Sequence, residues 1–250
     1  TQPSAIRFVK SGPQTERSGI ETFVAEFFNP NTRNRVAAEC RTEPLADYRG
    51  LLGKIDAAVI AAPTHLHYRV GVDLARHGVH LMIENPLCGS LAEADDLVEL
   101  AEAQGIVLQV GHVERFNPAL RGIEAIGKAA RYIESHRLAP FSFRSTDIGV
   151  VLDLMIHDID IILNLVKSDL ESIHAAGVPV LSQRVDIANA RLTFENGCVA
   201  NVTASRISMK NMRKIRIFQP DAYISVNCYK KEVSVTRLDD SLNREPFPHI

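Results

Sequence analysis

One apolar segment of the sequence carries a regular series of polar residues. Residues 150–166 read VVLDLMIHDIDIILNLV, and four polar side chains follow one another there at intervals of four, three and four: Asp153, His157, Asp160 and Asn164. At about 100° per residue this spacing places all four on one narrow face of a helix. Because ionisable groups are costly to bury without partners, we expect this face either to be satisfied internally or to line a wet cleft.

Asp153 lies one helical turn before His157 and can pair with it. A carboxylate there would orient the imidazole ring and favour its protonated form, which suits a general acid/base that acts on a hydroxyl group. An equally good interpretation is a structural Asp–His pair that ties the helix to a sheet. A metal site made of His157, Asp158 and Asp160 is less favoured, because Asp158 points away from the polar face and no second ligand cluster stands out. We therefore expect no metal.

A polar loop follows a strand-like run near the middle of the chain. Residues 111–120, GHVERFNPAL, contain His112, Glu114, Arg115 and Asn117. A loop in this place suits contact with a substrate or a cofactor, and an ordinary polar linker would have the same composition.

A second polar cluster lies just before the apolar helix. Residues 134–147, ESHRLAPFSFRSTD, contain His136, Arg137 and Arg144. Cationic groups near a site suit an anionic substrate, such as a phosphorylated or nucleotide-linked one. The alternative is a solvated surface.

The elements that position these residues alternate regularly. Continuous apolar runs typical of buried strands alternate with segments of helical spacing, which predicts strands at 56–63, 79–84 and 106–111 and helices at 65–78 and 91–104. Ser90 and Glu93 form an S-x-x-E capping box at the start of the second helix. This β-α-β-α-β order predicts a parallel sheet, and ligands of such sheets bind beyond the carboxyl ends of the strands. The predicted ends lie at 62–64, 84–86 and 111–112.

The second half of the chain has a different pattern. Long alternating segments surround an Asn-Gly turn at 195–197 and further turns near 219–221 and 229–230, which predicts hairpins of a mainly antiparallel sheet. The fold class is therefore α/β: a Rossmann-like parallel-sheet domain with an incomplete N-terminus at 1–115, followed by an α+β domain with a large, mainly antiparallel open sheet at 116–250.

Bulk composition narrows the class of protein. The chain has 250 residues, of which 46% are hydrophobic and 23% charged, and its net charge is -2. Nucleic acid is therefore not an expected partner, and no run of about 20 apolar residues indicates a membrane span. The sequence does not open with a signal peptide, and the four cysteines share no CxxC spacing, so we expect reduced thiols and a cytoplasmic location.

The motifs together resemble a known family. Residues 59–118, VIAAPTHLHYRVGVDLARHGVHLMIENPLCGSLAEADDLVELAEAQGIVLQVGHVERFNP, are similar to the nucleotide-binding domain of the Gfo/Idh/MocA oxidoreductases. GHVERFNPAL together with SHRLAPFSFRSTDIGVVLDLMIHDIDIILNLV most resembles the sugar-nucleotide branch, the UDP-N-acetylglucosamine 3-dehydrogenases. The resemblance runs from about Gly19 to Arg237, and it lies in the order and spacing of the motifs.

The resemblance implies an enzyme that uses NAD or NADP to oxidise a hydroxyl of a sugar nucleotide in lipopolysaccharide biosynthesis and that assembles as a homo-oligomer, a dimer or a tetramer. It also implies roles for residues. The catalytic set would be Asp153, His157 and Asn85; the cofactor set Asn29, Ala62, Pro63, Thr64, His67, Glu84, Asn85 and His112; and the substrate set Arg115, His136, Arg144 and Asp147.

Three features depart from the family pattern. The family's E-K-P turn is Glu84-Asn85-Pro86 here, so a lysine charge that would lower the pKa of the reacting hydroxyl is missing. The glycine-rich turn should fall on residues 4–9, which contain no glycine, and Asn29 replaces the ribose-binding acid. The chain also stops soon after its last strand. We therefore expect a truncated or rearranged member, and the alternative function is a catalytically impaired relative that binds a sugar nucleotide or only oligomerises.

Overall fold

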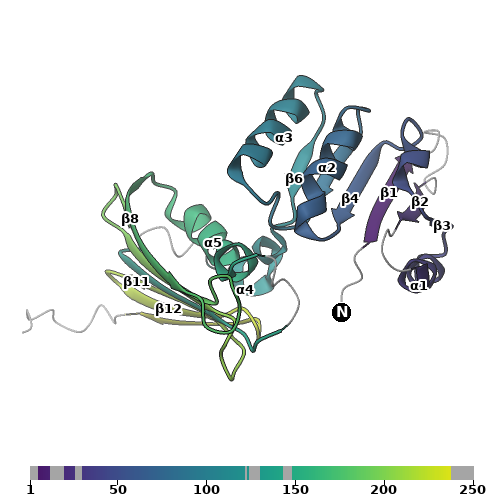
Figure 1. The fold of residues 1–250 in the computed structure, drawn as a ribbon. Helices are drawn as coiled ribbons and strands as arrows, with labels where there is room; N and C mark the ends of the chain where they lie inside the picture. Colours follow the sequence, from purple (N-terminus) through teal and green to yellow (C-terminus); the bar gives the residue numbers. More distant parts are fainter. Residues whose placement is uncertain are drawn as a thin grey trace, which may run out of the picture. The chain divides into compact units, whose positions relative to one another are not determined.

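The computed structural model describes residues 5–11, 20–25, 30–121, 123, 130–142 and 148–237. The chain divides into two compact units, residues 1–112 and 113–250, and each is taken by itself below. Figure 1 shows the elements of both units in sequence colours.

The first unit is built on a six-stranded sheet with the order β3-β2-β1-β4-β5-β6. Its parallel part consists of β4 (Ala57–Ala61), β5 (His80–Ile83) and β6 (Leu108–Val110), joined by helices α2 (Thr64–Ala75) and α3 (Leu91–Ala103). The predicted β-α-β-α-β order is confirmed. The strands form because short apolar runs are buried on both faces. Ile60 of β4 and Ile83 of β5 share one core with Val70 and Leu74 of α2 and Leu97 of α3.

Local signals set the ends of the helices in this unit. Ser90 Oγ accepts a hydrogen bond from the Glu93 N–H at 3.3 Å, as the capping box predicts. The Glu93 carboxylate accepts from the N–H of Gly89 at 3.1 Å rather than from that of Ser90. Gly78 and Gly105 end the two helices with φ values of 72° and 63°, which favour glycine.

The other half of this sheet differs from the expectation. β1 (Ala5–Ser11) lies between β2 (Ile20–Ala25) and β4 and runs antiparallel to both, while the short β3 (Pro44–Leu45) is parallel to β2. Helix α1 (Pro30–Cys40) and the 3-10 turn η1 (Tyr48–Leu51) complete the unit. Placing the glycine-rich turn on residues 4–9 was therefore wrong from Ala5 onward, because these residues form a strand inside the sheet.

The second unit contains a seven-stranded sheet with the order β13-β12-β11-β7-β10-β9-β8. β7 and β10 are parallel to each other, and all other neighbours are antiparallel. The predicted hairpins at 195–197, 219–221 and 229–230 are present. The strands are β7 (Tyr132–Leu138), β8 (Leu170–Val178), β9 (Ile187–Phe194), β10 (Val199–Ser205), β11 (Met212–Gln219), β12 (Ala222–Asn227) and β13 (Glu232–Arg237).

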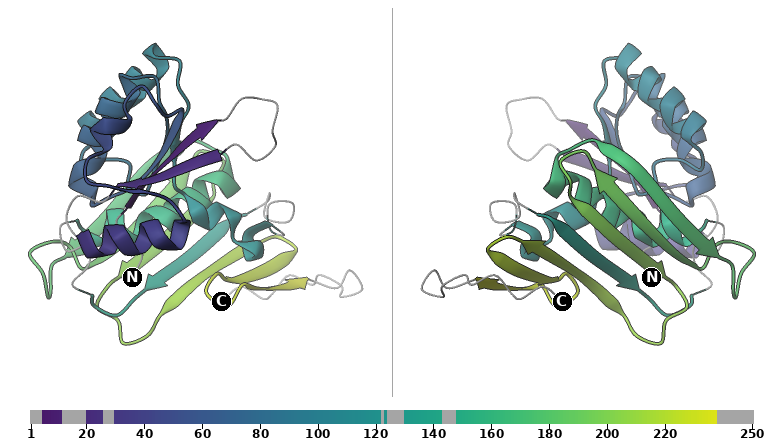
Figure 2. Two further views of the ribbon diagram at one scale, coloured as in Figure 1. Left: turned by 90° about the vertical axis from the view of Figure 1, so that its right-hand side faces the viewer. Right: turned by 90° about the vertical axis from the view of Figure 1, so that its left-hand side faces the viewer.

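One face of this sheet packs against helix α5 (Ile156–Val166), and the short η2 (Val113–Phe116) and α4 (Pro118–Arg121) precede β7 in the chain. Figure 2 shows the sheet from two sides, with the helices on one face. The shared core is made of alternate strand residues and of the inner side of α5, including Ile133, Ile162, Ala200, Val202, Ile215 and Ile217. No helix in the described ranges is long and apolar enough to cross a membrane.

The apolar helix at 150–166 is not one regular, fully buried α-helix. A π-helical turn at Val151–Met155 precedes α5, and the side chains of Val151 and Leu163 are exposed. The polar cluster at 134–147 was also misinterpreted in part, because its first residues belong to the central strand β7.

Candidate functional site

Three carboxyl strand ends in the first unit are joined by hydrogen bonds. Glu84 N–H donates to Ile60 O at 2.9 Å and Gly111 N–H donates to Ile83 O at 2.7 Å, so the ladder continues past the ends of β4, β5 and β6. The predicted ligand-facing residues Ala62, Pro63, Thr64, Glu84, Asn85 and His112 are all partly exposed here. These residues therefore lie at one edge of the sheet, the edge at which open parallel sheets bind ligands.

The two ring nitrogens of His67 connect the segments that follow β4 and β5. Its Nδ1 lies 2.8 Å from Pro86 O and its Nε2 lies 2.7 Å from Ala62 O, and the residue is 1% exposed. Both partners are acceptors, so a neutral imidazole, which has one N–H, can donate to only one of them and the protonated ring donates to both. Because both ring nitrogens face backbone oxygens, His67 shapes the turn that begins at Asn85.

Asn85 connects the same turn to the end of β6. Its Nδ2 lies 3.0 Å from His112 Nδ1, whereas its Oδ1 is buried and has no hydrogen-bond partner within the described residues. Gly111 allows Glu84 to lie close to the end of β6: a Cβ at residue 111 would lie 2.8 Å from Glu84 Oε2 and 3.2 Å from Glu84 Cα. The edge thus presents hydrogen-bonding groups and one buried acceptor that a ligand donor could satisfy.

In the second unit, Asp153 lies in the π-helical turn and His157 in the first turn of α5, and both side chains are partly exposed. They are therefore not sealed in apolar packing. A partly exposed carboxylate and imidazole on one helical run can take up and release protons.

Asp158, which we expected to point away from the polar face, is a partner of a buried arginine. Arg137 Nε and Nη2 donate to Asp158 Oδ1 at 2.9 and 2.6 Å, and each of these side chains is 3% exposed. Arg137 Nη1 also donates to Glu114 Oε1 at 3.3 Å. Burial alone would lower the pKa of Arg137, but Asp158 and Glu114 raise it above its ordinary value, so the guanidinium stays charged.

Glu114 is the acidic centre of the same cluster. Its carboxylate also accepts from Arg213 Nη1 at 2.8 Å and from Asn117 Nδ2 at 3.2 Å. Burial acts to raise the pKa of Glu114, and the nearby Arg137, Asn117 and Arg213 outweigh it, so the pKa lies below its ordinary value. Glu114 is therefore ionised at neutral pH.

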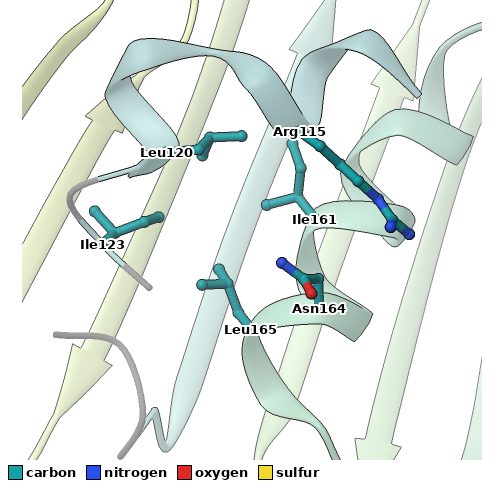
Figure 3. A pocket seen from close by; sticks show the side chains of 6 residues that line it. All are labelled: Arg115, Leu120, Ile123, Ile161, Asn164 and Leu165. Carbon is teal, nitrogen blue, oxygen red and sulfur yellow. The ribbon is translucent and has the colours of Figure 1, made fainter. Parts of the chain in front are cut away.

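Arg115, a predicted substrate ligand, forms a bidentate pair with Asp160. Its Nε and Nη2 donate to Asp160 Oδ2 and Oδ1 at 2.7 and 2.5 Å, while the arginine side chain remains 51% exposed. Figure 3 shows Arg115 and Asn164 beside a small pocket with an apolar lining. Its volume of ≈ 10 Å³ is enough for about one water, so this pocket by itself does not hold a sugar nucleotide.

A larger cavity of ≈ 390 Å³ lies in the second unit, between the helical run and strands β8 and β9. Its lining is almost entirely apolar and includes Val151, Met155, Ile159, Ile173 and Leu192. Such a lining offers few partners for the hydroxyl and phosphate groups of a sugar nucleotide.

Not all predicted residues come together. His136 and Arg137 alternate along β7, so Arg137 points to the face that carries α5 and His136 to the opposite face. Asn29, Arg144 and Asp147 lie outside the described residues. The described residues contain no group of three or more His, Cys, Asp or Glu side chains arranged to hold a metal.

The buried cluster of Glu114, Arg137 and Asp158 escaped sequence reasoning. The sequence places Glu114 in a polar loop and Arg137 in a polar cluster, and it offers Asp158 only for the less favoured metal site. Every second residue of 132–138 is buried, but these positions are Ile133, Ser135 and Arg137, so the sequence shows no apolar alternation that would have revealed the cluster.

An α/β sheet with polar carboxyl ends, followed by a domain with a large open sheet, is the architecture of dinucleotide-dependent oxidoreductases of the two-domain type. Two family models match the chain: the oxidoreductase family with an NAD-binding Rossmann fold at residues 10–112, and the GFO/IDH/MocA C-terminal domain at residues 129–225. The chain belongs to the Gfo/Idh/MocA oxidoreductase family.

Individual relatives agree with this assignment. The chain is 40% identical over 207 residues to UDP-N-acetylglucosamine 3-dehydrogenase of Acidithiobacillus ferrooxidans, a match that covers 82% of this chain and 66% of the relative. It is 32% identical to scyllo-inositol 2-dehydrogenase (NAD(+)) of Bacillus subtilis over 62% of this chain and 49% of the relative. The chain thus spans about half to two thirds of the length of these curated relatives.

Solved structures give the same fold. The UDP-N-acetylglucosamine 3-dehydrogenase GnnA from Acidithiobacillus ferrooxidans superposes with a TM-score of 0.78 at 38% identity, covering 84% of this chain and 70% of that one. The WlbA dehydrogenase from Bordetella pertussis, solved in complex with NADH and UDP-GlcNAcA, has a TM-score of 0.78 at 18% identity, covering 90% of this chain and 70% of that one. At that identity the likeness concerns the fold alone.

Proposed function

We propose that this protein oxidises a hydroxyl group of a sugar nucleotide similar to UDP-N-acetylglucosamine and passes the hydride to NAD or NADP. The observation that carries the proposal is the 40% identity over 207 residues to a UDP-N-acetylglucosamine 3-dehydrogenase. The polar strand ends of the first unit and the Asp153–His157 run of the second are consistent with it.

The strand ends fit a nicotinamide in one respect. Asn85 Oδ1 is a buried acceptor without a partner among the described residues, and an amide N–H of a carboxamide group would satisfy it. Ala62, Pro63, Thr64, Glu84 and His112 would line the same edge, and His67 would hold its shape. When bound, the nicotinamide would accept the hydride.

The proton of the reacting hydroxyl requires a base from the chain. We assign this role to His157, with Asp153 orienting the imidazole and stabilising its charged form. Arg115, which remains half exposed beside Asp160, and Arg144 and Asp147 are the proposed substrate contacts. His136 is the weakest of the proposed substrate ligands, because it lies on the sheet face opposite α5.

A specific observation also favours the second function, a relative that binds a sugar nucleotide without efficient turnover. β1 runs antiparallel to β4, so Ala5 pairs with Ala61 and Ser11 lies at the edge away from the ligand. Within the described residues, β1 therefore does not lead into a phosphate-binding turn beside β4. Asn85 also favours weak turnover, because its side chain cannot supply the positive charge of a lysine.

NADH fluorescence distinguishes the two functions. The dehydrogenase predicts a saturable change in nicotinamide fluorescence and NADH formation when NAD and UDP-N-acetylglucosamine are both present. Absence of any fluorescence change at millimolar cofactor contradicts the dehydrogenase. Asn85→Lys is expected to raise turnover only if the cofactor binds, and Asn85→Met is the matched control for side-chain length.

Assembly and location are further proposals that rest on the resemblance. We propose a nucleotide-binding part at 1–115, a substrate and oligomerisation part at 116–250, a cytoplasmic location and a role in lipopolysaccharide biosynthesis. The sheet face opposite α5 carries an aromatic cluster in which Phe218 lies 5.9 Å from Tyr132 and 5.1 Å from Tyr223 between ring centroids, which supports homo-oligomerisation through this face. Sedimentation of the wild type and of Phe218→Asp tests the proposed assembly: the variant should form a smaller oligomer than the wild type.

A further inference from the structure

Two consecutive residues of η2 connect to one turn of α5. Arg115 binds Asp160 directly through two hydrogen bonds at 2.7 and 2.5 Å. Glu114 reaches Asp158 through Arg137, which donates to both carboxylates. The two aspartates are the first and third residues after His157, so both connections end on the turn that carries this histidine.

The geometry of these ion pairs restricts rotation as well as distance. The Arg115–Asp160 pair is bidentate, and such a pair is planar with one preferred orientation, in contrast to a lysine ammonium. Arg137 instead donates from Nε and Nη2 to a single oxygen of Asp158, Oδ1. Arg137 and Asp158 are each 3% exposed, and the Glu114 side chain is 11% exposed, so water competes little for their hydrogen bonds. The turn of α5 is therefore held at two points by groups of defined direction.

Such a restraint is needed at this place in the chain. The π-helical turn ends at Met155 and the α-helix begins at Ile156, so the change of helical geometry falls between Asp153 and His157. Regular α-helical periodicity alone therefore does not set the direction of the imidazole relative to Asp153. Contacts made beyond His157, at Asp158 and Asp160, can set it.

We propose that Glu114, Arg115 and Arg137 are positioning residues, which fix the direction of the His157 imidazole through Asp158 and Asp160. The consequence for catalysis rests on the proposed function, in which His157 accepts the hydroxyl proton. Arg115 then acts mainly through Asp160, and its contact with substrate is secondary.

The test uses the full chain and compares Asp160→Asn with Glu134→Gln. The control removes the carboxylate charge of an ion pair in the same unit, Glu134 with Arg216 at 3.0 Å, which joins β7 to β11 and does not involve α5. The first readout is independent of activity: the ¹⁵N resonances of the His157 imidazole, identified with His157→Gln, and amide exchange over 156–160. The second is kcat and KM for UDP-N-acetylglucosamine.

We expect Asp160→Asn to shift the His157 resonances and to speed exchange over 156–160, with Glu134→Gln unchanged. Displacement of a reacting group by about 1 Å can cost about 100-fold, so kcat should fall by up to that factor while KM changes less than about threefold. Asp160→Glu keeps the charge and should recover part of kcat. If Asp160→Asn does not fold, Arg115→Lys replaces it, because it keeps both charges and loses only the bidentate geometry.

Unchanged resonances and exchange in the variant overturn the proposal, whatever the activity. Shifted resonances without turnover by the wild type refute the proposed function and leave the positioning role in place. A rise in KM with kcat unchanged would assign Arg115 and Asp160 to substrate binding and overturn the positioning role.

Discussion

Replacing Arg137 by methionine is expected to destabilise the second unit strongly. The guanidinium makes three hydrogen bonds to two carboxylates, at 2.9 and 2.6 Å to Asp158 and at 3.3 Å to Glu114. Methionine fills a similar volume but leaves Asp158 as a buried carboxylate that has lost its ion-pair partner. Glu114 keeps Arg213, at 2.8 Å, and is less affected.

The magnitude follows from the burial of the charge that remains. Removing one partner of a buried ion pair typically costs about 3–5 kcal/mol, because the other charge stays desolvated. Domains have about 5–15 kcal/mol of stability in total, so the loss would be a large fraction of it. Replacing Asp158 by leucine as well removes the orphaned charge, and the double variant Arg137→Met/Asp158→Leu should recover a large part of the loss.

Urea unfolding followed by circular dichroism measures this cost, with Arg216→Met as the control. Arg216 and Glu134 are 40% and 29% exposed, so their pair is expected to contribute less than about 1 kcal/mol. The reasoning is refuted if Arg137→Met costs no more than Arg216→Met. It is also refuted if the double variant is less stable than Arg137→Met alone, because the cost would then not come from the unpaired carboxylate.

Three further changes test other parts of the structure. The pKa of Glu114 is lowered in the folded state, so its contribution to the free energy of unfolding is present above the ordinary pKa of 4.5 and is lost as pH falls through the folded pKa. As the pH is lowered in the acid range, the urea midpoint of Glu114→Gln should therefore fall less steeply than that of the wild type. Gly111→Ala puts a Cβ 3.2 Å from Glu84 Cα and should lower stability by about 1–3 kcal/mol in the same assay. Burial raises the pKa of Cys88 to about 11, so iodoacetamide at about pH 8 should label it slowly until urea unfolds the chain; rapid labelling of the native protein would contradict its burial.

The parallel half of the first sheet could be predicted because its signals are local. Apolar runs such as that at 57–61, helical spacing and the Ser90 cap each act within a few residues. The direction of β1 could not be predicted in this way. An apolar run indicates a strand but not whether the strand runs parallel or antiparallel to its neighbour, and counting back from Asn29 assumed a turn where the chain continues in β1.

β7 was missed for a different physical reason. Alternate residues of this strand are buried, but those positions contain Ile133, Ser135 and Arg137 rather than an apolar series. A buried arginine is tolerable only because Asp158, which is 21 residues away in sequence, lies against it in space. Such a pairing depends on the completed sheet and helix, so neither residue alone predicts it.

The carboxyl ends of β4, β5 and β6 could be predicted in their position but not in their contacts. The carboxyl ends of parallel strands meet at one edge, which follows from topology. The shape of the turn at Asn85, however, depends on His67 beneath Pro86 and on the close approach of Glu84 to Gly111. Neither of these two contacts uses the Asn85 side chain, which contacts His112 instead. Replacing the expected lysine by asparagine therefore changes the charge at the turn while its main supports remain, and activity gained by Asn85→Lys would report on that charge.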